Sequence, residues 1–148
     1  MLKVGDTIPS FSLKNQDGEE VSISPNDRKV RIIYFYPKDD TKVCTEQACG
    51  FRDWKDVITE KGIDIIGISS DSVSAHQKFK ARHHLNFTLL SDPKGKVRKQ
   101  FGATYLFGII PARITYIINK NGKIEYLYEG MFKGLEHAEN CINIIEKL

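Results

Sequence analysis

The pattern of apolar positions predicts strands that alternate with helices through the middle of the chain. Residues 30–36 form a continuous run of β-branched and aromatic side chains, broken only by one arginine, that stops at Pro37. Such a run predicts a central strand that is buried on both faces. Residues 63–69 have the same character and predict the next buried strand, and residues 87–90 predict a short third one.

A helical spacing of apolar residues follows the first two of these predicted strands. Residues 44–61 and 71–84 predict the two longer helices, and residues 98–101 predict a short one. Residues 135–148 predict a closing helix. The core-facing positions of the first helix are Gln47, Phe51, Trp54 and Ile58.

Turn residues predict an antiparallel hairpin near each end of the chain. Residues 11–23 contain the turn Asn-Gln-Asp-Gly between two short apolar segments, and residues 113–128 contain Asn-Lys-Asn-Gly in the same setting. Together the elements predict an α/β fold with a central mixed β-sheet flanked by helices. This is the element order of a thioredoxin-like fold with an N-terminal β-hairpin extension, and we expect one domain over residues 1–148.

Composition is typical of a soluble globular protein and restricts the classes of partner. The chain has 22 basic and 19 acidic residues, which are interspersed and leave a net charge of +3, so we expect no nucleic-acid partner. The basic residues 94–99 are interpreted as a solvated loop and helix start. No run approaches the roughly 18 apolar residues of a membrane helix. The first residues lack the apolar segment of a signal peptide, so we expect a cytoplasmic protein, or an organellar one if a transit peptide has been removed.

Three cysteines are an odd number, which favours a reducing compartment over a disulfide scaffold. Cys44 follows the first predicted strand at the start of a helix, where unpaired N–H groups and the helix dipole favour a thiolate. A small buried hydrophobic residue is an equally good interpretation from position alone.

Cys49 lies five residues further on, near the polar side of the same predicted helix. Positions i and i+5 of an intact helix have Cα atoms roughly 8.7 Å apart, whereas a disulfide tolerates roughly 7 Å at most. A bridge between the two cysteines therefore requires residues 43–51 to unfold locally. The spacing also argues against a thiol–disulfide exchange centre, in which two residues separate the cysteines.

The residues around Cys44 resemble the active-site segment of peroxiredoxins, and most closely that of the Q-type, or bacterioferritin comigratory protein, subfamily. The segments that carry the resemblance are residues 34–41 (Tyr-Phe-Tyr-Pro-Lys-Asp-Asp-Thr), 44–49 (Cys-Thr-Glu-Gln-Ala-Cys) and 51–53 (Phe-Arg-Asp). Residues 66–69, 87–92, 101–102 and 113–118 agree as well. The resemblance spans nearly the whole chain. It implies a thioredoxin fold, and it implies an enzyme that reduces hydrogen peroxide and organic hydroperoxides.

The resemblance also implies a role for each of five residues. Cys44 matches the peroxidatic cysteine, and Cys49 matches the resolving cysteine. Thr41 matches the hydroxyl that bonds thiolate and peroxide, and Pro37 matches the proline that shields the sulfur. Arg113 matches the arginine that holds the thiolate and polarises the substrate.

The same resemblance implies thioredoxin or glutaredoxin as the reductant, a role in antioxidant defence, and a monomer. No cofactor and no metal are expected. A thiol–disulfide oxidoreductase and a non-catalytic thioredoxin-like binding module are the rival interpretations. They predict, respectively, disulfide reduction without peroxide and a Cys44 that does not react with alkylating reagents.

The sequence departs from the family just before Cys44, where Lys42-Val43 replaces the usual Pro-Gly and predicts a stiffer or differently shaped loop. Cys141 is expected to be buried, with a resolving role as the alternative. Residues 105–110 form an apolar loop that lines the peroxide pocket, contacts a partner or covers the sheet. The four histidines, His76, His83, His84 and His137, are expected at the surface or at helix caps.

Overall fold

The apolar runs of the sequence form the parallel centre of a seven-stranded sheet. The structure is a computed structural model that describes residues 1–147. The central strands are β3 (Arg31–Phe35), β4 (Asp64–Ser69) and β5 (Thr88–Ser91). β4 pairs in parallel with both neighbours, and the order across the sheet is β2-β1-β5-β4-β3-β8-β9. The three predicted strands are confirmed to within about one residue at each end.

Antiparallel hairpins extend this centre on both sides and make the sheet mixed. The N-terminal hairpin consists of β1 (Phe11–Asn15) and β2 (Glu20–Ile23), and β1 joins the sheet beside β5. The second consists of β8 (Ile114–Ile118) and β9 (Ile124–Glu129), and β8 pairs antiparallel with β3. Both predicted hairpins are therefore confirmed.

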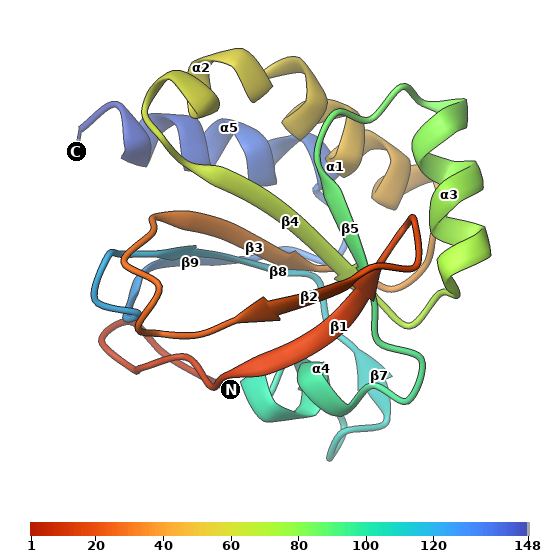
Figure 1. Ribbon diagram of the computed structural model, residues 1–148, viewed down its shortest axis with the longest axis horizontal. Coiled ribbons are helices and arrows are strands. Elements are labelled where there is room, and N and C mark those ends of the chain that lie inside the picture. Colours follow the sequence, from red (N-terminus) through yellow and green to blue (C-terminus); the bar gives the residue numbers. More distant parts are fainter. Residues whose placement is uncertain (148) are drawn as a thin grey trace.

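Helices cover both faces of the sheet because β3 presents apolar side chains alternately to each face. Ile32 and Tyr34 pack under the layer of α1, α2 and α5, whereas Ile33 and Phe35 pack on the side of α4 (Figure 1). The helices are α1 (Lys42–Asp53), α2 (Lys55–Glu60), α3 (Val73–Arg82), α4 (Lys96–Phe101) and α5 (Gly134–Ile145). Within residues 1–147, no helix has the length and apolar character that crossing a membrane requires.

The helix predicted over residues 44–61 is wrong as a single element, because it is interrupted at Trp54. This residue ends α1 and begins α2 with a non-helical backbone (φ −95°, ψ 3°), and its side chain is 37% exposed instead of buried. Phe51 and Ile58 are fully buried as predicted. The apolar spacing survives the break, so periodicity alone does not reveal it.

The apolar loop before Arg113 contains a short antiparallel pair, β6 (Thr104–Tyr105) and β7 (Ile110–Pro111). Leu106, Phe107 and Ile109 at its tip are exposed, so these side chains do not cover the sheet. The predicted closing helix ends at Ile145, and Leu148 lies outside the described residues.

Candidate active site

Cys44 lies in the first turn of α1, immediately after β3 ends at the carboxyl edge of the parallel strands. Thr41 is the N-cap, and the first intrahelical bond runs from the N–H of Thr45 to the carbonyl of Thr41 at 2.9 Å. The N–H groups of residues 42–44 precede this bond and have no helical acceptor. These groups and the helix dipole favour negative charge at Cys44, whose side chain is 1% exposed.

The antiparallel pairing of β8 with β3 brings Arg113 to Cys44. Ile114 is the partner of Phe35 in the register, so Arg113 lies where β8 starts and β3 ends. The Nη2 group of Arg113 donates a hydrogen bond to Sγ of Cys44 at 3.1 Å. The buried guanidinium therefore places a positive charge next to the sulfur, which favours negative charge there.

Two further hydrogen bonds fix the orientation of the Arg113 guanidinium. Its Nε donates to the carbonyl of Met131 at 2.7 Å, and its Nη1 donates to Oε1 of Gln47 at 2.6 Å. Gln47 is fully buried and lies three residues after Cys44 in α1. Because all three nitrogens have acceptors, Nη2 stays directed at the sulfur.

Thr41 and Pro37 lie on the loop that joins β3 to α1. Pro37 is half-buried and directly follows the fully buried Tyr36. Thr41 is exposed, and its hydroxyl donates to the carbonyl of Lys38 at 2.9 Å. In this state the hydroxyl hydrogen is engaged within the loop.

A buried contact between Asp39 and His76 anchors this loop to α3. The Asp39 carboxylate lies 2.6 Å from Nδ1 of His76 and accepts a hydrogen bond from the Tyr36 hydroxyl, also at 2.6 Å. His76 is fully buried and its Nε2 lies 3.0 Å from the carbonyl of Leu90. The expectation that His76 lies at the surface or at a cap is therefore wrong, because its partners come from elements distant in sequence.

The left-handed residue of the loop is Asp40, with φ of 60°. Its carboxylate is held by Arg82 at 2.9 Å and by Nε2 of His83 at 3.1 Å. Lys42 and Val43 belong to the first turn of α1, where a β-branched residue needs no positive φ. The positive φ lies two residues before this pair, at an aspartate that tolerates it, so Lys42-Val43 is not strained by the turn. A stiffer loop stays a prediction.

Comparison with known proteins identifies the family of the chain. Residues 4–127 match the model of the AhpC/TSA family. The chain belongs to this family. It is 42% identical over 145 residues to the chloroplastic peroxiredoxin Q of Oryza sativa subsp. japonica, covering 97% of this chain and 67% of that protein. The chloroplastic peroxiredoxin Q of Triticum aestivum is 43% identical with the same coverage.

Solved structures give the same result for the fold. The crystal structure of peroxidoxin BcpB from Mycobacterium tuberculosis is similar with a TM-score of 0.91 and 31% identity, covering 100% of this chain and 99% of that one. The PrxQ of Xylella fastidiosa is similar with a TM-score of 0.90 over 99% and 97% of the two chains, at 24% identity. The protein is a Q-type peroxiredoxin with the predicted thioredoxin-like fold, and hence a thiol-dependent peroxidase.

A second buried arginine of this peroxiredoxin, Arg98, joins the two segments that carry Pro37 and Arg113. It donates to the carbonyls of Tyr36 and Ala112, the latter at 2.7 Å. Burial lowers the pKa of Arg98 to about 10, so it remains cationic at neutral pH. The interpretation of residues 94–99 as solvated is wrong here, because the third residue of α4 points into the core.

The other two cysteines of the peroxiredoxin differ in exposure, and all three are free thiols. Cys49 is half-buried in the same unbroken helix as Cys44. Cys141 is fully buried in α5, as expected, and burial raises the pKa of its thiol to about 12. A thiol that stays protonated is a poor nucleophile, which favours the structural interpretation of Cys141.

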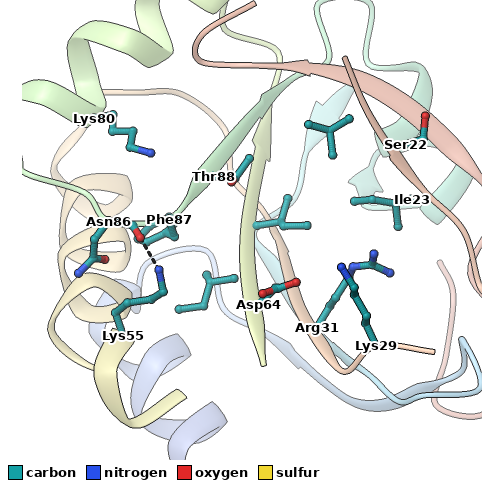
Figure 2. A pocket seen from close by; sticks show the side chains of 13 residues that line it. Ser22, Ile23, Lys29, Arg31, Lys55, Asp64, Lys80, Asn86, Phe87 and Thr88 are labelled. Atoms are coloured by element: carbon teal, nitrogen blue, oxygen red, sulfur yellow. Dashed lines mark hydrogen bonds between the residues drawn. The ribbon is translucent and has the colours of Figure 1, made fainter. Parts of the chain in front are cut away.

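Two other places in the peroxiredoxin bring polar side chains together. Asp39, Asp71 and His76 offer ligand atoms within 4.8 Å of one another, yet they already bond one another and their neighbours in the loop anchor. A pocket of about 390 Å³ lies where the central strands begin, at the opposite edge from Cys44. Figure 2 shows lysines on both sides of β4 around it, with Lys55 donating to the carbonyl of Asn86. Neither place includes Cys44 or Arg113.

Proposed function

We propose that Cys44 is the peroxidatic cysteine of this peroxidase. Its thiolate attacks one oxygen of the peroxide, the O–O bond breaks, and the second oxygen leaves as an alkoxide or hydroxide that takes up a proton. Cys44 becomes a sulfenic acid. The observation that carries this proposal is the 3.1 Å hydrogen bond from Arg113 Nη2 to Cys44 Sγ at the start of α1.

Arg113 stabilises both the thiolate and the charge that develops on the leaving oxygen. Donors that are already oriented toward developing charge lower the barrier because they need no reorganisation. The fixed guanidinium supports this role. Thr41, once its hydroxyl turns from Lys38, donates to the peroxide, and Pro37 shields the sulfur from water.

Cys49 is proposed as the resolving cysteine, whose thiol condenses with the sulfenic acid of Cys44 to form a disulfide and release water. Both residues lie in the continuous helix α1, so the bridge requires residues 43–51 to open. The first turn of α1 also packs against α5, where an added Cβ at Gly134 would lie 2.4 Å from the carbonyl oxygen of Val43. Opening therefore separates α1 from the start of α5.

An external dithiol protein, thioredoxin or glutaredoxin, then reduces the disulfide by exchange. Phe132 follows Met131, whose carbonyl accepts the hydrogen bond from Arg113, and Leu135 lies at the start of α5. Both side chains are exposed apolar groups, which supports contact with that reductant. We further propose a monomer made of one domain over residues 1–148, acting in antioxidant defence. Its compartment is one that keeps thiols reduced, the cytoplasm or an organelle.

The test is peroxide consumption by the reduced protein, followed by intact-mass analysis after one equivalent of hydrogen peroxide. Cys44→Ser is expected to abolish consumption, whereas Cys141→Ser, at a buried thiol outside the site, is the matched control and keeps it. The parent protein is expected to lose two hydrogens through a Cys44–Cys49 bridge. Consumption by Cys44→Ser at the parent rate would refute the assignment.

A further inference from the structure

Arg113 is the end of a buried hydrogen-bond network that reaches the last helix. Oε1 of Gln47 accepts from Arg113, and Nε2 of Gln47 donates to Oγ1 of Thr115 at 3.4 Å. Oγ1 of Thr115 lies 2.7 Å from Nδ1 of His137, and Nε2 of His137 lies 2.8 Å from the carbonyl oxygen of Gly130. We call these five residues the Arg113–His137 network. Its three central side chains, Gln47, Thr115 and His137, are fully buried.

The donor and the acceptor of every hydrogen bond in the network can be assigned by starting at Gly130. The carbonyl of Gly130 only accepts, so Nε2 of His137 carries the hydrogen and Nδ1 of the neutral ring is an acceptor. The Thr115 hydroxyl must then donate to Nδ1, which leaves its oxygen to accept from the Gln47 amide. The carbonyl end of Gln47 is thereby turned toward the guanidinium.

The opposite orientation of Gln47 would be unfavourable for Arg113. A flipped amide would present N–H groups to Nη1, and two donors facing each other in a buried site leave both unsatisfied. Nη1 would lose the acceptor that helps hold the guanidinium plane, and Nη2 would no longer be held on the sulfur. The position of the hydrogen on the His137 ring thus determines the orientation of the Arg113 guanidinium toward Cys44.

We propose that His137 is a positioning residue for catalysis, acting on Arg113 through Thr115 and Gln47. The proposal rests on the assigned roles of Cys44 and Arg113 and deepens them. Burial lowers the pKa of His137 to about 4, with the Arg113 charge adding to this, so the ring is neutral at physiological pH, as the network requires. The C-terminal helix α5 therefore takes part in the geometry of the active site through His137.

The test compares two substitutions at the same position. His137→Leu removes both the donor and the acceptor, whereas His137→Gln supplies an amide N–H for Gly130 and an amide oxygen for Thr115. We expect His137→Leu to shift the pH profile of Cys44 alkylation by iodoacetamide to higher pH, and to lower kcat/KM for hydrogen peroxide roughly tenfold. His137→Gln is expected to restore most of both properties.

A merely structural role for His137 makes a different prediction. Ile142→Ala is a cavity-forming substitution at a buried position of α5 outside the network, and it is the matched control for lost stability. It should leave the alkylation profile unchanged, as should His137→Leu if His137 serves packing alone. A folded His137→Leu protein with the parent profile and the parent kcat/KM would overturn the proposal.

If His137→Leu does not fold, Thr115→Val carries the test, because it interrupts the same network with a side chain of similar size. The same two readouts then decide the outcome, and parent-like values in Thr115→Val would equally overturn the proposal. Failure of the inference is distinguishable from failure of the proposed function. An active Cys44→Ser protein would remove the peroxidatic assignment itself, whereas an inactive Cys44→Ser with an unaltered His137→Leu would remove the positioning role alone.

Discussion

Acidification is expected to destabilise this protein through His137. The ring is fully buried, accepts a hydrogen bond from Thr115, and faces the positive charge of Arg113, with only the Glu136 carboxylate favouring protonation among its charged neighbours. Burial is the largest cause that lowers its pKa, from 6.5 to about 4. The folded state therefore binds fewer protons than the unfolded state between these two values. The stability that depends on a neutral His137 is fully present above about pH 6.5, and it is lost as the pH falls toward 4.

The magnitude follows from the two pKa values of His137. One unit of difference corresponds to about 1.4 kcal/mol, so the full effect of His137 is about 3 kcal/mol. Integration of the proton linkage gives a loss of about 2 kcal/mol in the free energy of unfolding between pH 7 and pH 5. This is a large fraction of the roughly 5–15 kcal/mol that stabilises a typical domain.

The assay is urea unfolding of the reduced protein, followed by far-ultraviolet circular dichroism at several pH values between 7 and 5. His137→Gln is the comparison, because its side chain does not titrate while every other ionisable group is shared. The parent is expected to lose about 2 kcal/mol more than His137→Gln across this range. Parallel curves for the two proteins would refute the reasoning, because they would mean that His137 is not held neutral by the fold.

Three further predictions concern the site. Arg113→Met should lower kcat/KM for hydrogen peroxide about a hundredfold or more by removing the donor to the sulfur, and an unchanged value would refute that role. Cys49→Ser should still consume one equivalent of peroxide but fail to turn over with thioredoxin as the reductant, with mass analysis showing sulfenic acid; full turnover with thioredoxin would exclude Cys49 as resolver. Trp54, at the end of α1, should change its fluorescence on oxidation of the parent but not of Cys49→Ser; identical responses would contradict the opening of α1.

Much of the fold was predictable from local pattern. The buried strands and both hairpins have short-range signals, namely continuous apolar runs and Asn-Gly or Asp-Gly turns, and these signals do not depend on the rest of the chain. The break at Trp54 has no such signal, because one non-helical residue hardly disturbs the spacing of Phe51 and Ile58. The burial of His76 and His137 was missed for a related reason, since a satisfied buried imidazole needs partners that spacing does not reveal.

The sequence by itself determined that Cys44 follows a buried strand in the first turn of a helix, and that Cys49 is too distant in an intact helix to bridge it. Only the tertiary structure decided that Arg113 meets the sulfur, because this depends on the register of β8 against β3. It also decided the direction of the network from Gly130 to Arg113, which joins β8, α1 and α5. Hydrogen bonds between side chains distant in sequence follow from packing, and packing is a property of the whole fold.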